Sequence, residues 1–311
     1  VGPANQTITV GTHAPASAIY DNTFPVAATA SSGLTVTITT TGGCSIAGGT
    51  VTMTSGTTDC VVHFNQAGNA SFNPAPEITE TVDAQKANAI IDVDGVSVVY
   101  DGLMHGATGS ATGVNSENLS SSLNLGNSFK NVPGGTAHWT FTGDANDNDA
   151  EGYIAIERTQ QDNAIWLVAS DDFSNKVYDG TATATVNPQY IVYITDNVFV
   201  SYVEAHFDNK NIGTEKLVTV TGLSLTGTDT GNYNLLNTEA TTNADITAAP
   251  ITAAVSVENK AYDGTDAATM SGCVLTGAAL GDDVSCSATS ATFADAEIGN
   301  GKEVTAVGIT L

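Results

Sequence analysis

The tripeptide Tyr-Asp-Gly recurs along this chain at a nearly constant spacing. It begins at Tyr100, Tyr178 and Tyr262, and a near-copy, Tyr-Asp-Asn, begins at Tyr20, so the four tyrosines lie 80, 78 and 84 residues apart. A period of about 80 residues is too long for helical solenoid or propeller repeats and matches a small β-sandwich with its own core. The sequence therefore predicts four tandem domains, each marginal in stability because a chain of that size buries only about 60% of its unfolded surface.

The segments between the tripeptides carry strand patterns. Thr, Val, Ile and Ala alternate with other residues in 35–41, 49–58, 191–203 and 216–228, and Gly, Asn and Asp cluster between these runs. No stretch has a sustained apolar stripe at helical spacing. We therefore expect an all-β fold, a linear tandem array of Ig-like β-sandwich domains, with strands in these four segments.

The charge balance is strongly acidic, with 33 acidic residues against 8 basic ones and a formal net charge of -25. Nucleic acid is an implausible partner, because phosphate binding needs a Lys/Arg footprint and these basic residues are scattered singly. The acidity is typical of a solvated extracellular surface. Adaptation to salty water and binding of divalent cations are the alternatives.

The start of the chain and its hydropathy bear on location. Val1 follows neither a Met nor an apolar leader, and no apolar run approaches the roughly 18 residues of a membrane span. We expect a mature or excised piece of a longer protein, with no membrane span in this segment.

The four cysteines form two local pairs, Cys44 with Cys60 and Cys273 with Cys286. Each pair brackets a stretch that resembles a hairpin, and a disulfide closing a loop of this size stabilises a domain by roughly 3 kcal/mol. Two disulfides indicate an oxidising compartment. A metal site or a catalytic thiol is the alternative, but CxxC spacing and a nearby shared histidine are both missing.

The third and fourth repeats align over most of their length. NKVYDGTATATV, at 175–186, matches NKAYDGTDAATM, at 259–270, and 205–225 matches 291–311. In such a motif Asp-Gly turns the chain at the end of a strand, while the tyrosine offers a large ring to the core. We interpret each Tyr-Asp-Gly as a buried aromatic followed by a turn; a ligand contact is the alternative.

These strings carry a family resemblance. Residues 160–248 and 249–311 resemble the bacterial YDG domain, through NKVYDGT and NKAYDGT and the strings aligned above. Residues 87–159 are similar to the bacterial Ig-like module called MBG, through VVYDGLMHGATGSATGV and NVPGGTAHWTFTGD, and residues 1–86 to another bacterial Ig-like repeat, through TASSGLTVTITTTGGCSIAGGTVTMTSGTTDCVV. The resemblance implies an extracellular, non-enzymatic array at a bacterial cell surface and brings no catalytic residues. We expect the modules to meet near Ala87, Gln160 and Ala249.

The fourth repeat is shorter than the third. After the segment that matches 205–225, the third repeat continues through 226–247, whereas the fourth ends at Leu311. A sandwich without its last strands has an unpaired edge, which is a template for strand addition. Truncation of a longer protein is one interpretation; completion by a segment of an identical chain, head to tail, is the other.

Catalytic motifs are scarce. The histidines at 13, 63, 105, 138 and 206 have no second histidine or cysteine at ligand spacing, and neither a GxSxG elbow nor an SxxK pair of the serine-nucleophile kind is evident. We therefore expect no enzyme, no cofactor and no catalytic metal.

One acidic stretch resembles the start of a calcium loop. Residues 144–151 place Asp144, Asn146 and Asn148 at alternating positions, but Asp149 stands where an EF-hand loop requires Gly, and Ala155 where it requires Glu. These three residues are weak calcium candidates; a polar connecting loop is the alternative.

A glycan surface is a further possibility to weigh. Thr35-Val36-Thr37 and Thr50-Val51-Thr52 could present a flat threonine array, but alternating threonine is also ordinary strand surface. The tryptophans, Trp139 and Trp166, lie in different segments, and we expect both to be buried.

The leading hypothesis is a structural one: the stalk or fibre segment of an extracellular bacterial surface adhesin or filament, in contact with neighbouring modules of its own or identical chains. The alternative is a surface-binding module that depends on a glycan or on calcium.

Overall fold

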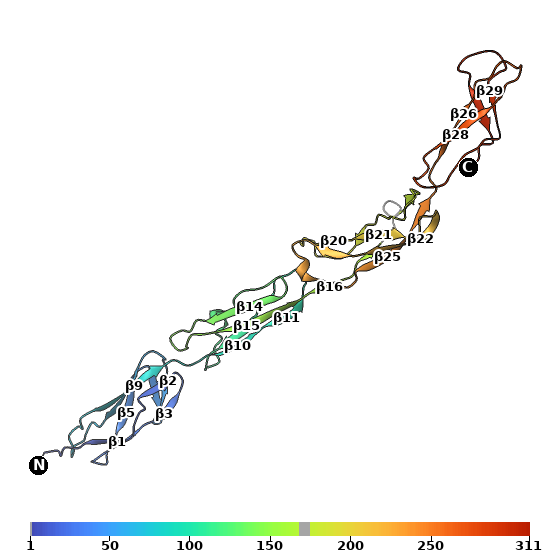
Figure 1. Cartoon of the computed structure of the whole chain (residues 1–311). Helices are drawn as coiled ribbons and strands as arrows, with labels where there is room; N and C mark the ends of the chain where they lie inside the picture. The colour runs from blue at the N-terminus through green and yellow to red at the C-terminus, as the bar shows by residue number, and fades with distance from the viewer. Residues whose placement is uncertain (1, 168–174) are drawn as a thin grey trace. The chain divides into compact units, whose positions relative to one another are not determined.

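The computed structural model describes residues 2–167 and 175–311. Within these residues the regular structure is β-strand apart from two short 3-10 turns, η1 (Ser120–Ser122) and η2 (Thr230–Asn232), so the predicted all-β class is confirmed. The chain divides into two compact units, Val1–Gln160 and Gln161–Leu311 (Figure 1). Each unit holds two groups of strands, which we call the first to fourth modules: β1–β9, β10–β15, β16–β25 and β26–β30.

The first module packs a four-stranded sheet, in the order β2-β9-β8-β5, with the sheets β3-β7-β6 and β1-β4. The side chains of strand β8 alternate between the core and the other face of the sheet. Cys60, Val62 and Phe64 are fully buried, while the residues between them are not. The strands are β1 (Ile8–Thr12), β2 (Ser17–Ile19), β3 (Thr23–Pro25), β4 (Ala27–Ala30), β5 (Thr37–Gly42), β6 (Cys44–Ala47), β7 (Thr50–Met53), β8 (Cys60–Asn65) and β9 (Ile78–Gln85).

The second module has the four-stranded sheet β11-β15-β14-β13 and the pair β10-β12. Strands β14 and β15 form its longest hairpin and lie side by side in Figure 1. Ile156 and Arg158 of β15 are buried, and so is Tyr100. The strands are β10 (Ile90–Asp94), β11 (Val96–Val99), β12 (Thr108–Thr112), β13 (Leu123–Asn124), β14 (Gly134–Phe141) and β15 (Ala150–Thr159).

The third module has the four-stranded sheet β18-β25-β22-β21 and three strand pairs. Its core is built on Phe207, Val218, Val220 and Ile246, which are at most 2% exposed. The strands are β16 (Gln161–Asn163), β17 (Trp166–Leu167), β18 (Lys176–Val177), β19 (Pro188–Gln189), β20 (Phe199–Ser201), β21 (Glu204–Phe207), β22 (Gly213–Thr221), β23 (Ser224–Thr226), β24 (Tyr233–Leu235) and β25 (Glu239–Thr247).

The fourth module is smaller and holds the sheet β27-β29-β30 and the pair β26-β28. Strand β30 corresponds in sequence to part of β22, and β29 to β21. The strands are β26 (Thr252–Val257), β27 (Ala267–Ala268), β28 (Met270–Thr276), β29 (Ser290–Phe293) and β30 (Val304–Val307).

Of the four segments expected to be strands, 35–41 and 216–228 are largely strand, 49–58 is strand only at Thr50–Met53, and 191–203 is mostly not strand. In 191–203 only Phe199–Ser201 forms a strand, and Ile191 and Ile194 are 72% and 102% exposed. The β-branched pattern predicts a strand there, but the segment includes the turn at Ile194–Thr195, and among the described residues most of it has no partner strand. Propensity alone does not form a strand without a partner.

Candidate functional site: the Tyr-Asp-Gly turns

The strand before each Tyr-Asp-Gly occupies the same place in its module. Strands β2, β11 and β18 end directly before Tyr20, Tyr100 and Tyr178, and each pairs in parallel with the last strand of its module, β9, β15 or β25. That last strand in turn pairs antiparallel with β8, β14 or β22. We call β9, β15 and β25 the terminal strands.

Each of these three tyrosines donates its backbone N–H to the end of the terminal strand. The donors at Tyr20, Tyr100 and Tyr178 lie 2.8 Å from the carbonyl oxygens of Gln85, Thr159 and Thr247, respectively. The bond extends the parallel ladder by one residue, at the point where the chain leaves the strand. The tripeptide therefore marks where the early strand and the terminal strand of a module are fastened together.

The aspartate closes the turn that follows. In the third module the carboxylate of Asp179 accepts hydrogen bonds from the Thr181 amide at 2.9 Å and from its hydroxyl at 2.8 Å, and an ion pair from Lys176 at 2.7 Å. The next residue, Gly180, has φ 82°, a left-handed conformation that favours glycine. Turn chemistry thus accounts for both residues of the Asp-Gly pair.

The fourth module repeats this arrangement. Asp263 accepts from the Thr265 amide and hydroxyl, both at 2.9 Å, and pairs with Lys260 at 2.8 Å. The hydrogen bond from the lysine, followed by that from the threonine amide, lowers the pKa of Asp179 and of Asp263 to about 2. We call this four-residue arrangement of lysine, aspartate, glycine and threonine the lysine clamp.

The second module uses a different cation. Arg158 of the terminal strand, with a fully buried side chain, donates to Asp101 at 2.6 Å, and His105 contacts the other carboxylate oxygen at 2.8 Å. Burial opposes ionisation of Asp101, but the hydrogen bonds from Arg158, the Leu103 amide and His105 outweigh it and hold the pKa well below its usual range. In this module a side chain of the terminal strand thus contacts the aspartate of the tripeptide directly.

The sequence predicts a buried tyrosine in each tripeptide, and the structure bears this out unevenly. Tyr100 is 1% exposed and Tyr20 and Tyr178 are half-buried, but Tyr262 is 66% exposed. The prediction is wrong for Tyr262, because the described residues around it, 258–266, form no strand that would hold the ring against a sheet. Sequence reasoning also missed Lys176 and Lys260, although the string NKxYDGT repeats the lysine at the same place.

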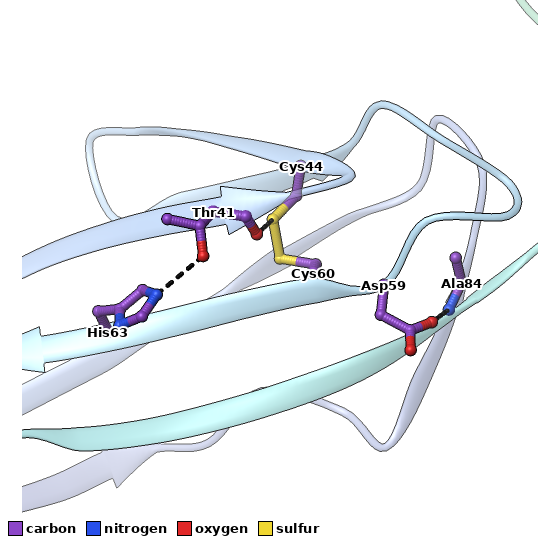
Figure 2. Close-up of a disulfide and its surroundings, with 6 residues drawn as sticks. All are labelled: Thr41, Cys44, Asp59, Cys60, His63 and Ala84. Atoms are coloured by element: carbon purple, nitrogen blue, oxygen red, sulfur yellow. Dashed lines mark hydrogen bonds between the residues drawn. A yellow bond between two sulfur atoms is a disulfide. The ribbon is translucent and has the colours of Figure 1, made fainter.

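The disulfides join different parts of a module. Cys44 and Cys60 are bonded, with Cα atoms 5.3 Å apart, and connect β6 of the three-stranded sheet to β8 of the four-stranded sheet (Figure 2). Beside this bond His63 of β8 contacts the Thr41 hydroxyl of β5 at 2.9 Å. Cys273 of β28 is bonded to Cys286, with Cα atoms 5.7 Å apart. The first pair is thus a covalent link between two sheets.

The three calcium candidates lie in a turn that contacts the segment between the first two modules. Asp144 accepts from the amides of Asn146 and Asp147, and the Asn146 side chain accepts from Gly56 at 3.1 Å. The Asn148 amide group donates to Asn88 at 2.8 Å. The side chains of the three candidates therefore make hydrogen bonds within the turn and to residues beside it.

The residue between the candidates is the unusual one. Asp147 is 1% exposed, and neither of its carboxylate oxygens has a hydrogen-bond partner among the residues that the structure describes. Burial raises its pKa, and repulsion from Asp144 and Glu117 raises it further. A buried carboxylate without partners favours protonation or a cation.

The histidines are separate from one another. His13, His63, His105 and His138 each contact one carboxylate, on Glu80, Glu77, Asp101 and Glu151. In residues 2–167 and 175–311 no group of three His, Cys, Asp or Glu side chains is placed to hold a metal ion. Those same ranges contain no helix long and apolar enough to cross a membrane.

The tryptophans differ from expectation. Trp139 is half-buried and lies over Gly152 of the neighbouring strand, whereas Trp166 is 43% exposed at the end of β17. The expectation of two buried rings is wrong for Trp166, which lies on the two-residue strand β17, paired with β19.

Comparison with known proteins gives one family match. The model of the YDG domain matches residues 167–244 and 247–311, which fall in the third and fourth modules. A search of curated proteins gave no match.

Three solved structures are similar to this chain. The structure of surface layer protein SbsC, domains 1-6, and that of the S-layer protein rSbsC(31-844) each show 14% identity and a TM-score of 0.23, and each match covers 98% of this chain and 48% of the other. Drosophila N-cadherin EC1-4 shows 11% identity and a TM-score of 0.22, with 78% and 73% covered. This chain spans about half the length of the S-layer chains.

Proposed function

We propose that this chain is a non-catalytic spacer, the stalk or fibre segment of an extracellular bacterial surface adhesin or filament. Its modules transmit tension and set distance. The first two modules are of the bacterial Ig-like and MBG types, with boundaries near Ala87, Gln160 and Ala249. The partners are neighbouring modules of the same or identical chains, which complete unpaired sheet edges head to tail.

The observation that carries this proposal is the parallel ladder between the early strand and the terminal strand. The chain enters the second module through β10 and then β11 and leaves it after β15, and β11 and β15 are parallel. A pull on both ends of the module slides the two strands in opposite directions along their length. All hydrogen bonds of the ladder then bear the load together, and the Tyr100 amide bond adds to them.

The disulfides and the charge support a location outside the cell. Two disulfides persist in an oxidising compartment. A net charge of -25 favours solubility and opposes non-specific association. The YDG domain match covers the third and fourth modules, where the resemblance to bacterial surface arrays is strongest.

Single-molecule pulling tests the proposal. Stretching the whole chain between its ends should give separate unfolding events, one per module, with the disulfides shortening the extension of the first and fourth. The Val98→Pro variant removes the backbone N–H that faces the carbonyl of Glu157 in the ladder, and should lower the unfolding force of the second module.

The matched control is Ser97→Pro, on the same strand. Because residues of a parallel strand alternate in the side to which their amides point, Ser97 faces away from β15, and its substitution should leave the unfolding force nearly unchanged. Unfolding of all modules at negligible force, or equal effects of the two variants, would reject a load-bearing spacer.

The second candidate function is calcium binding, and the specific observation in its favour is the unpartnered carboxylate of Asp147. Carboxylate and amide oxygens are the ligands that calcium prefers, and Asp144, Asn146 and Asn148 surround this residue in sequence. Calorimetric titration of the whole chain with calcium should then show heat and a higher melting temperature, both abolished in Asp147→Asn. No heat and no shift would remove this candidate, and a glycan array on the same protein tests the sugar-binding alternative.

A further inference from the structure

Asp147 stands at a position that an aromatic residue occupies in two other modules. Phe72 of the first module is half-buried at this position, and Tyr233 of the third is 3% exposed. Each of the three positions pairs in parallel with a residue near the start of its module: Phe72 with Ala4, Asp147 with Ala87, and Tyr233 with Gln161. The second module therefore places a carboxylate where the first and third place a ring.

The backbone holds Asp147 as it holds Phe72. The Ala87 amide donates to the Asn146 carbonyl, and the Asn148 amide donates to the Ala87 carbonyl, both at 2.8 Å. The first module makes the same two bonds around Phe72, also at 2.8 Å. Because the pairing of a strand fixes the face to which each side chain points, Asp147 points inward as the ring does, and it is 1% exposed.

The third module shows which group the inward side chain meets. There the Tyr233 hydroxyl donates to the Asp196 carboxylate at 2.7 Å. Asp196 directly precedes Asn197 in the loop after β19. In the second module Glu117 directly precedes Asn118 in the loop after β12, and β12 pairs with β10 as β19 pairs with β17. Glu117 is therefore the carboxylate that corresponds to Asp196.

The Glu117 carboxyl folds back into its own loop. A Cβ added at Gly113 would lie 2.3 Å from the carboxyl carbon of Glu117, so the glycine leaves room for this group. Its Oε2 is buried and, like both carboxylate oxygens of Asp147, has no hydrogen-bond partner among the described residues. Burial raises the pKa of Asp147, and repulsion from Asp144 and Glu117 raises it further. The two unpartnered carboxylates thus lie close enough to repel one another.

The chain's own cation does not bridge them. The charge of Lys86 acts on Asp147, but its ammonium donates to the backbone carbonyl of Asp144. Two buried carboxylates that repel one another favour a bound cation or a proton. Calcium takes about six to eight oxygen ligands and accepts carbonyl oxygens and water beside carboxylates, so two acidic side chains are enough to anchor it.

We propose that Asp147 and Glu117 together bind one calcium ion inside the second module, where the third module has the hydrogen bond between Tyr233 and Asp196. The ion takes the place of the hydroxyl as the link between the loop 113–118 and the turn 143–148. Because Asp147 also pairs with Ala87, the ion binds beside the segment that joins the first two modules and holds it in place. This inference rests on calcium binding, the second candidate function, and assigns its ligands.

Calorimetric titration of the whole chain with calcium chloride, after treatment with a chelator, tests the two ligands. The original should bind one ion at this site. Asp147→Asn should abolish binding, and Glu117→Gln, which keeps the size of the side chain, should weaken it on the order of tenfold or more. The matched control is Glu151→Gln, an exposed carboxylate of β15, which should bind within about twofold of the original.

A second variant tests the correspondence with the third module. In Asp147→Tyr the hydroxyl should donate to Glu117 as Tyr233 donates to Asp196, so this protein should bind no calcium at the site. Its melting temperature should be the same in chelator and in calcium, whereas that of the original should rise with calcium. The backbone carries an aromatic residue at this position in two other modules, so Asp147→Tyr provides a folded comparison if Asp147→Asn does not fold.

The outcomes separate the ligand assignment from calcium binding in general. Calcium heat of the original size in Glu117→Gln, or in Asp147→Tyr, would overturn this inference and leave calcium binding at another place in the chain. No calcium heat in the original would remove both the inference and the second candidate function. The spacer function is tested by pulling and does not depend on either result.

Discussion

The backbone amide of Tyr178 donates to the carbonyl oxygen of Thr247 across 2.8 Å, and so joins the repeated tripeptide to the last residue of its module's terminal strand. The same bond is made by Tyr20 and by Tyr100. A sequence motif that recurs every 80 residues or so therefore corresponds to a tertiary contact between the early part and the end of each of these modules. Its stability depends on both strands and on the groups that hold the turn.

Removal of the buried arginine should destabilise the second module. In Arg158→Met the Asp101 carboxylate loses its strongest partner, and we expect a loss of about 2 kcal/mol in the free energy of unfolding. Chemical denaturation measures it. The control is Glu151→Gln, which breaks the exposed pair with His138 and should change the free energy by less than about 0.5 kcal/mol. Equal effects would show that Arg158 acts only as surface charge.

Asp179 should make stability depend on pH in the acidic range. Its pKa is about 2 in the folded protein and near 4 when unfolded, so its contribution is present above pH 4 and is lost as the pH falls through 2. Asp179→Ala should cost roughly 0.5–1 kcal/mol at neutral pH, since the side chain is more than half exposed, and this cost should shrink steadily as the pH falls from 4 through 2. Melting temperatures of the two proteins across this pH range test it, and parallel curves would contradict it.

Asp147 should behave in the opposite way. The pKa of Asp147 is higher in the folded protein than in the unfolded chain. The ionised side chain therefore lowers the free energy of unfolding at high pH, and this loss disappears as the pH falls below the pKa of the unfolded chain. We expect Asp147→Asn to stabilise the chain at neutral pH by on the order of 1 kcal/mol. Without calcium, a melting temperature lower than that of the original at neutral pH would show that the carboxylate has a stabilising partner.

Two glycines of the fourth module provide a matched test of the turn. A Cβ added at either Gly264 or Gly272 would have nothing within 4 Å, but only Gly264 has a positive φ, of 76°. Gly264→Ala should therefore cost about 1 kcal/mol, while Gly272→Ala should be neutral or slightly stabilising. The difference in denaturation midpoint between the two variants isolates the backbone term. A cost that is the same for both would mean that the left-handed turn is not needed.

The disulfide between Cys44 and Cys60, which joins the two sheets, should stabilise the first module. Replacement of both Cys44 and Cys60 by alanine should lower the free energy of unfolding by roughly 3 kcal/mol. The reductant dependence of melting is the measurement: the original should lose stability in reductant, and the double variant should lose only the part that belongs to Cys273 and Cys286. Four titratable thiols in the unreduced protein would contradict both bonds.

Much of the fold could be predicted from local sequence. Alternating Thr and Val predicted the strands β5, β7 and β22, and the repeat of Tyr-Asp-Gly predicted a turn because aspartate accepts from the amide two residues later and glycine tolerates positive φ. These features depend on residues close together in the chain. The prediction of a strand at 191–203 was wrong because it used the local pattern alone. Among the described residues, most of this segment has no partner strand.

The sequence by itself determined the repeat, the strand class and the turns, because the repeat and the alternating residue pattern are properties of the sequence itself, and the turns rest on contacts between residues two or three positions apart. Tertiary structure alone decided that Tyr100 is buried while Tyr262 is exposed, that Arg158 reaches Asp101 from 57 positions away, and that within the described residues the buried Asp147 carboxylate has no hydrogen-bond partner. The physical reason is that each of these depends on groups far apart in the chain: in the first three modules the terminal strand comes late in the sequence and pairs with the strand that precedes the tyrosine.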